Sequence, residues 1–193
     1  NYFRFFIADA TGHGIQAALT TMIIKTEYDK IKFMSGLPHL IMAFLNNSFI
    51  EKYSNLNVYF TCTIVDVDLN ENKFYYSSAG HPEQFLILNN ELTTVKASGR
   101  MIGICENLDY EVKSYNFIKG SKAFLFTDGM FEEFNDEKIE FGLSRFFNIM
   151  QKEKSKDIKT ITKSIFNELN NFIGKSCPND DITLIGIEYP LSN

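Results

Sequence analysis

The alternation of apolar and polar positions predicts an α+β protein in which helices and antiparallel strands occupy separate stretches of the chain. An apolar strand over 3–8 leads into a Gly-rich turn, and apolar residues at helical spacing follow from Ile15 to about Lys30. Pro38 suits the first turn of a second helix, which is expected to end near Tyr53. After it the period changes to two, which is typical of strands. Strands are expected over 58–67, 73–78, 84–88, 92–96 and 110–117.

The last third of the chain adds a strand, two helices and a closing strand. The strands are expected over 122–127 and 182–189, and the helices over 140–153 and 157–173. Each of the four predicted helices has residues at the spacing of one helical face: Ile15, Ala18, Leu19, Met22 and Ile23 on the first, Leu40, Ile41, Phe44, Leu45, Ser48 and Phe49 on the second, Phe141, Phe146, Ile149 and Met150 on the third, and Ile158, Ile161, Ile165, Leu169 and Phe172 on the fourth. This order of elements favours sheets covered by helices.

Composition and charge narrow the class of protein. The chain has 193 residues, 45% of them hydrophobic, which suits one domain with a core of its own. A net charge of −5 argues against nucleic acid as a partner. Apolar runs fall short of the roughly 18–20 residues that span a membrane, so no membrane contact is expected. Cys62, Cys105 and Cys177 form no C-x-x-C pair, which predicts isolated thiols in a reducing, cytoplasmic compartment.

Three acidic positions stand where strands end or begin. Asp9 and Asp128 each follow an apolar strand, and Asp180 with Asp181 precedes the last one. Each acid alone is also explained as an Asx-turn or a helix cap. If the three strands are neighbours, however, the carboxylates converge and need a cation to offset their repulsion. Oxygen ligands select a hard ion such as Mg²⁺ or Mn²⁺, and a pair of such ions is suited to hydrolysis of phosphate esters.

Five short motifs in order connect these acids to a known family. They are DATGHGIQAAL at 9–19, SAGHP at 78–82, GRMIGI at 99–104, TDG at 127–129 and DDIT at 180–183. Together they resemble the metal-dependent protein phosphatase 2C superfamily (PPM), and within it the bacterial stage II sporulation protein E branch. The resemblance covers essentially the whole chain.

The resemblance implies a fold, a reaction and a set of site residues. The fold would be two stacked antiparallel sheets flanked by helices on both outer faces, an α-β-β-α sandwich. By this resemblance Asp9 bridges two Mn²⁺ or Mg²⁺ ions and the Ala10 carbonyl binds one of them. Asp128 and Asp180 bind the second ion, while Asp181 stands where the family has Asn or Asp. The reaction would be hydrolysis of phosphoserine or phosphothreonine by a metal-bridging hydroxide, so Asp9, Asp128 and Asp180 form the expected catalytic set.

The resemblance also implies a context for the chain. The family places another acidic motif on a strand ahead of the one with which this chain begins. Residues 1–193 are therefore expected to be a single phosphatase domain that lacks its first strands and was cut from a longer regulatory protein. The expected partners are a phosphorylated regulatory protein such as an anti-sigma-factor antagonist, an upstream sensor or receiver domain, and a second copy in a homodimer.

Several other interpretations remain open at this stage. His13 could donate a proton or only orient the turn, and His81 has no assigned role. Gly12-x-Gly14-x-x-Ala17 also fits a dinucleotide-binding turn, although this fold would need a parallel strand afterwards. Asp66-Val67-Asp68 resembles the haloacid dehalogenase motif, although a hairpin turn explains it as well. The alternative from another class is a catalytically inactive phosphatase fold kept as a binding module for signalling.

Overall fold

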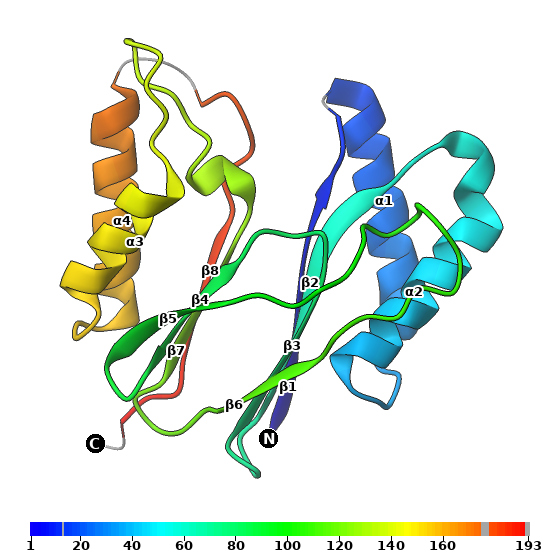
Figure 1. Cartoon of the computed structure of the whole chain (residues 1–193), viewed down its shortest axis with the longest axis horizontal. Coiled ribbons are helices and arrows are strands. Elements are labelled where there is room, and N and C mark those ends of the chain that lie inside the picture. The colour runs from blue at the N-terminus through cyan, green and yellow to red at the C-terminus, as the bar shows by residue number, and fades with distance from the viewer. Residues whose placement is uncertain (13, 175–177, 192–193) are drawn as a thin grey trace. The chain divides into compact units, whose positions relative to one another are not determined.

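The computed structural model in Figure 1 describes residues 1–12, 14–174 and 178–191. Its contacts divide the chain into two compact units, which are described one at a time. The first comprises residues 1–83 and 96–117, and the second residues 84–95 and 118–193. Each unit contains one four-stranded sheet with antiparallel pairing and two α-helices. The predicted α+β class is therefore confirmed.

The first unit is built on a sheet of order β1-β2-β3-β6. Both of its helices, α1 and α2, lie against one face of this sheet (Figure 1). Pairing of β1 with β2 sets Asp9 opposite Thr61, at the end of β1 that leads into α1. The elements of this unit are β1 (Tyr2–Ala10), α1 (Gly14–Ile31), α2 (Pro38–Tyr53), a 3₁₀ turn (Ser54–Leu56), β2 (Phe60–Asp68), β3 (Lys73–Ala79) and β6 (Lys113–Asn116).

The second unit is built on a sheet of order β5-β4-β7-β8. Helices α3 and α4 pack on each other and, through α4, on β8. The central strand β7 pairs with β4 on one side and with β8 on the other. The elements are β4 (Gln84–Leu88), β5 (Glu91–Val95), β7 (Lys122–Phe126), a 3₁₀ turn η2 (Asp128–Met130), α3 (Leu143–Glu153), α4 (Ile158–Ile173) and β8 (Leu184–Glu188).

Each unit has its own hydrophobic core between helices and sheet. In the second unit the rings of Phe85, Phe126 and Phe146 pack at tilted or edge-to-face angles, with centroids 4.8–5.0 Å apart. The predicted apolar face of α4 lies in this core, with Ile161, Ile165 and Leu169 buried. In the first unit Cys62 is a buried free thiol, and burial raises its pKa. Cys105 is a half-buried free thiol, and Cys177 lies outside the described residues.

The apolar face predicted for the first helix is not the face that α1 buries. Ile15, Leu19 and Met22 are exposed, whereas Thr20, Ile24, Glu27 and Ile31 are buried. Polar contacts explain why α1 buries this other face. The Glu27 carboxylate accepts hydrogen bonds from Lys30 at 2.6 Å, from Lys52 at 2.6 Å and from Tyr53 at 2.8 Å. In addition, Tyr28 stacks on Phe6 of β1 with ring centroids 3.9 Å apart. These contacts set the rotation of α1 against the sheet.

Two predicted elements begin three residues later in the chain than expected. The expected strand over 110–117 shortens to β6, because the Glu111 backbone turns to Ser98 and Ser77 instead of joining the ladder. Helix α3 begins at Leu143 and not at residue 140. The N–H groups of Phe141 and Gly142 are taken up by the carbonyls of Glu133 and Phe131.

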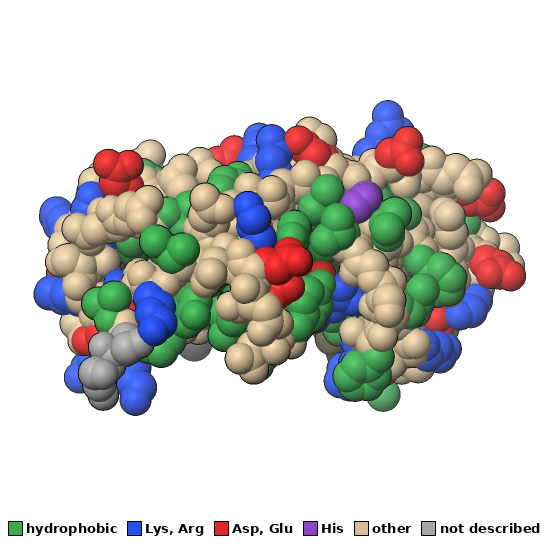
Figure 2. Space-filling model, turned by 90° about the horizontal axis from the view of Figure 1, so that it is seen from below, with side chains coloured by type: hydrophobic (Ala, Val, Ile, Leu, Met, Phe, Trp, Pro, Cys, Tyr) green, Lys and Arg blue, Asp and Glu red, His purple; other side chains and the backbone are tan. Residues whose placement is uncertain are grey.

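A buried ion pair joins β1, β2 and the α1–α2 loop. Arg4 donates to both carboxylate oxygens of Asp66, each at 2.7 Å, and to the carbonyls of Met34 and Gly36 at 3.0 and 2.8 Å. This loop and the amino-terminal end of the chain lie on the side seen in Figure 2, where basic, acidic and hydrophobic side chains are intermixed.

Asp66 is fully buried and paired, so it is not an accessible nucleophile. The haloacid dehalogenase interpretation is therefore wrong, and Asp68 caps the hairpin turn as the alternative required.

Among the described residues, none of the helices combines the length and the apolar character that crossing a membrane requires.

Candidate metal centre

The first unit contributes Asp9 and Ala10 at the end of β1. Ala10 packs against the core of the unit, and strand alternation therefore turns Asp9 to the opposite face of the sheet. Gly12 and Gly14 follow with φ of 94° and 73°, values that favour glycine, as the predicted turn requires. Helix α1 then leads to a second helix and an antiparallel sheet, so the dinucleotide-binding interpretation is wrong.

The two histidines differ in what the structure says of them. His13 lies outside the described residues. His81 is largely buried, with its Nδ1 2.9 Å from Thr61 Oγ1. Because Thr61 pairs directly with Asp9, the two side chains share one face of the sheet. His81 is thus linked through Thr61 to the strand end that carries the first acid, a connection that the sequence did not reveal.

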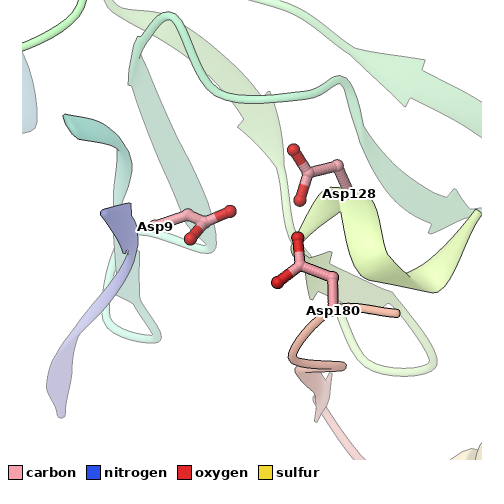
Figure 3. Close-up of side chains that lie close together, drawn as sticks. All are labelled: Asp9, Asp128 and Asp180. Carbon is pink, nitrogen blue, oxygen red and sulfur yellow. The ribbon is translucent and has the colours of Figure 1, made fainter. Parts of the chain in front are cut away.

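The second unit brings Asp128 and Asp180 together. Asp128 opens the η2 turn directly after β7, and Asp180 lies in the segment that leads into β8. Carboxylate oxygens of the two residues lie within 4.8 Å of each other. Figure 3 labels all three predicted acids and shows these two side chains directed into the same space. The sequence predicted this convergence from the strand ends, and within the second unit it is confirmed.

Both carboxylates are held locally by backbone N–H groups. One oxygen of Asp128 accepts from the N–H of Gly129 at 3.0 Å. One oxygen of Asp180 accepts from the N–H of Asp181 at 2.8 Å. Asp181 itself is exposed, and the contacts found for it are made by its backbone. These contacts distinguish Asp180, whose carboxylate faces Asp128, from its neighbour Asp181, which makes contacts through its backbone.

The TDG and DDIT segments are interlocked by their small residues. Thr127 Oγ1 donates to the carbonyl of Asp181 at 3.3 Å and accepts from the N–H of Thr183 at 3.2 Å. A Cβ at Gly129 would lie 2.5 Å from the Asp181 carbonyl oxygen, so only glycine allows this approach. The residues that flank the acids in the two motifs therefore fix the distance between the two segments.

Gln84 supports the end of β7 from the neighbouring strand. Its side-chain amide accepts from the N–H of Phe126 at 2.6 Å and donates to the carbonyl of Phe126 at 3.1 Å. The buried side chain of Gln84 thus forms the two hydrogen bonds to the Phe126 backbone that a paired strand would otherwise form, two residues before Asp128. Nothing in the local sequence marks Gln84 as a functional residue, because only the strand order shows that it lies beside Phe126.

Glu133 is a second residue whose role the local sequence does not indicate. It is buried, and its carboxylate accepts hydrogen bonds from the N–H groups of Asn179 and Asp180 and from the Asn179 side chain. A pair of adjacent acids after TDG was visible in the sequence. The pattern did not show, however, that the second of them turns inward.

The electrostatics of this part of the second unit suit a cation. The pKa of the Glu132 carboxyl is raised, first by burial and then by the negative charges of Asp128, Glu140 and Asp180. Carboxylate oxygens are the donors that hard divalent ions prefer. Asp128 and Asp180 therefore fit a Mg²⁺ or Mn²⁺ ion by donor type and by separation.

Comparison with known proteins agrees with this geometry. The family model described as "Stage II sporulation protein E (SpoIIE)" matches residues 1–190. The chain belongs to this family. Among curated relatives of this SpoIIE-family chain, phosphoserine phosphatase RsbU of Bacillus subtilis is 30% identical over 128 residues, which are 65% of this chain and 38% of RsbU. The chain thus spans well under half the length of that relative.

Solved structures extend the likeness to the fold. The SiaA-PP2C domain of Pseudomonas aeruginosa superposes with a TM-score of 0.84 at 20% identity, over 97% of this SpoIIE-family chain and 80% of that domain. RsbX, solved in complex with magnesium, superposes with a TM-score of 0.65 at 19% identity, over 96% and 84% of the two chains. At this identity the likeness concerns the fold, and it confirms the predicted PP2C-type fold.

Proposed function

We propose that this chain is the phosphatase domain of a regulatory protein and hydrolyses phosphoserine or phosphothreonine on a protein partner with the help of divalent metal ions. The observation that carries the proposal is the convergence of Asp128 and Asp180 in the second unit. Membership in the SpoIIE family and the phosphoserine phosphatase RsbU as a relative support it. The alternative of an inactive binding module has no observation of its own in its favour.

Asp9 and the Ala10 carbonyl complete the site in this proposal. Asp9 stands at the end of β1 on the face away from its helices, and the turn that follows is open enough for close approach of a ligand. The match to one solved PP2C domain covers 97% of this chain, which supports a single domain over residues 1–193. In that domain Asp9 would bridge two ions, while Asp128 and Asp180 would bind one of them.

The chain's own residues would hold and orient the reactants. Bound ions of this kind activate water and neutralise the charge of a phosphate ester. Asp128 and Asp180 would supply the oxygen ligands, and the interlocked TDG and DDIT segments would keep their separation fixed. The magnesium in the RsbX structure supports Mg²⁺ as one candidate, with Mn²⁺ as the other.

We further propose that the domain works inside a longer protein. The region matched in RsbU is only 38% of that relative, which leaves room there for other domains. An upstream sensor or receiver domain, an anti-sigma-factor antagonist as substrate and a homodimer are the specific expectations. Copurification of the full-length protein with its phosphorylated partner and its mass in solution would test them.

The direct test measures metal binding and phosphate release together. Calorimetry with Mn²⁺ and with Mg²⁺ should detect binding by the wild type, and Asp9→Asn, Asp128→Asn and Asp180→Asn should each weaken it at least tenfold. Phosphate release from a phosphoserine peptide should fall in parallel. Asp109→Asn, an exposed acid of a loop, is the matched control and should behave as wild type. Equal Mn²⁺ affinity in all variants would refute the site, and metal binding without any phosphate release would favour the binding module.

A further inference from the structure

We propose that Glu133 is a positioning residue that holds Asp180 in the geometry required for metal binding. The inference rests on the proposed metal role of Asp180, and it assigns to Glu133 a task that its place in the sequence does not indicate.

The segment before β8 has little regular structure of its own. Residues 178–183 belong to no helix or strand, and Asp180 is exposed. On one side this segment is tied to TDG by Thr127. The N–H groups of Asn179 and Asp180 have to be fixed by other means, because a segment without a ladder leaves them unpaired.

The Glu133 carboxylate supplies this fixation. The N–H of Asn179 donates to its two oxygens at 2.9 and 3.0 Å, the Asn179 amide donates to Oε2 at 3.1 Å, and the N–H of Asp180 donates to Oε1 at 3.1 Å. The bond from Asp180 begins at the very residue whose side chain faces Asp128. Hydrogen bonds to an ionised acceptor are about twice as strong as those between neutral groups.

Glu133 is itself rigidly mounted. Its carbonyl accepts from the N–H of Phe141 at 2.7 Å, and the Phe141 ring is buried in the core of the second unit. The residue has an exposed fraction of only 1%. A buried carboxylate is costly unless it is hydrogen-bonded, and each of the side-chain bonds found for Glu133 goes to the Asn179–Asp180 pair. The Glu133 side chain thus connects the core of the second unit to the backbone of Asp180.

In this arrangement Glu133 orients Asp180, the proposed metal ligand, through its backbone. Groups that orient a ligand typically change metal affinity by about 10–100-fold when they are replaced. Glu133→Gln keeps the shape of the side chain but removes its charge and turns an NH₂ group toward N–H donors. We expect the dissociation constant for Mn²⁺ to rise about tenfold or more in this variant.

Two readouts separate positioning from a general loss of stability. Amide hydrogen exchange should accelerate in the peptide that covers 178–183 of Glu133→Gln and stay unchanged in α4. Phosphate release should recover at saturating Mn²⁺, since the defect lies in metal affinity and not in the chemical step. Glu137→Gln removes an exposed carboxylate four residues further on and is the matched control.

Asn179→Ala serves as a second variant because its side chain is exposed and its loss does not endanger folding. It removes one of the donors to Glu133, so a smaller rise of the Mn²⁺ dissociation constant is expected. If the wild type binds Mn²⁺ and Glu133→Gln binds it within twofold, the positioning role is refuted. If Glu133→Gln does not fold, an unchanged affinity in Asn179→Ala refutes it instead. A wild type that binds no Mn²⁺ would overturn the proposed function itself.

Discussion

Replacing Arg4 by Met should be among the most destabilising single changes in the first unit. Arg4 meets both oxygens of Asp66 and also two carbonyls of the α1–α2 loop, at Met34 and Gly36. Asp66 has no exposed side-chain surface, and only 9% of the Arg4 side chain is exposed. Methionine fills the space of the arginine stem but leaves the Asp66 carboxylate buried without its cation.

The expected magnitude follows from this burial. Breaking a buried ion pair by removing one partner typically costs about 3–5 kcal/mol, because a charge stays behind without compensation. Loss of the hydrogen bonds to the two loop carbonyls adds little to this cost, because the carbonyls can accept hydrogen bonds from water instead. Tyr2 remains as a donor to Asp66, and burial followed by this hydrogen bond raises the pKa of Tyr2 to about 12. We therefore expect Arg4→Met to lower the free energy of unfolding by about 3–5 kcal/mol.

Removing both charges should restore most of the loss. A buried ion pair and a well-packed apolar pair of similar volume often differ by little in stability. For the double variant Arg4→Met with Asp66→Leu, the free energy of unfolding is expected to lie within about 2 kcal/mol of the wild-type value. Lys25→Met breaks an ion pair with Asp29 on the exposed side of α1 and is the control that should change nothing measurable.

Urea denaturation followed by circular dichroism measures these differences, with the slope of the transition as a check that the unfolded states are comparable. A loss below about 1 kcal/mol for Arg4→Met would show that the pair is not effectively buried. A double variant that loses the sum of the two single losses would show that the charges are not coupled. Either result would refute the reasoning.

Three further predictions concern pH, packing and metal. The pKa of Glu27 is lowered to about 2 from 4.5: burial would raise it, but the hydrogen bonds from Lys30, Lys52 and Tyr53 outweigh burial. The Glu27 carboxylate thus contributes to stability above pH 4.5, and this contribution is lost as the pH falls toward 2. In Glu27→Gln the melting temperature should therefore depend less on pH over that range than in the wild type. Profiles of melting temperature against pH that run parallel for the two proteins would contradict this. Gly129→Ala should cost about 1–3 kcal/mol in denaturant and weaken Mn²⁺ binding, because its Cβ would meet the Asp181 carbonyl; unchanged values would mean that the segments move apart freely. Mn²⁺ at about 100 times its dissociation constant should stabilise the domain by about 2.7 kcal/mol and EDTA should reverse this, whereas identical melting curves would exclude a metal site in the folded state.

Much of the fold could be predicted from local signals. Helix α2 and strand β4 begin and end at the predicted residues, because Pro38 and the turn at Asn89-Asn90 mark their boundaries. The buried face of α4 was predicted from its apolar period alone. The placement of Asp128 and Asp180 followed from the rule that strand ends gather at one edge of a sheet. Period and punctuation are properties of neighbouring residues, and they are visible in the sequence.

The failures share a physical cause, which is that side chains bond to partners far away in the sequence. Glu27 reaches Lys52 and Tyr53 of another helix, and this contact outweighs the apolar residues in setting the rotation of α1. Glu133 reaches Asn179, 46 positions further along the chain. Periodicity treats every charged residue as solvent-exposed, so it fails at the acids that the fold turns inward.

The polar interior of α1 has a consequence for how the first unit behaves over time. Of the 18 residues of α1, Ile24 and Ile31 are the apolar ones that are fully buried, and Ile23 and Tyr28 add partly buried contacts with the same core. Segments with few buried apolar contacts open locally at a lower free energy than the rest of a protein. Helix α1 begins a few residues after Asp9. If a ligand binds only when α1 is folded, its apparent affinity is reduced in proportion to the fraction of molecules in which α1 is folded. With the metal role proposed for Asp9, a substitution on the exposed face of α1 would change metal occupancy without altering any metal ligand.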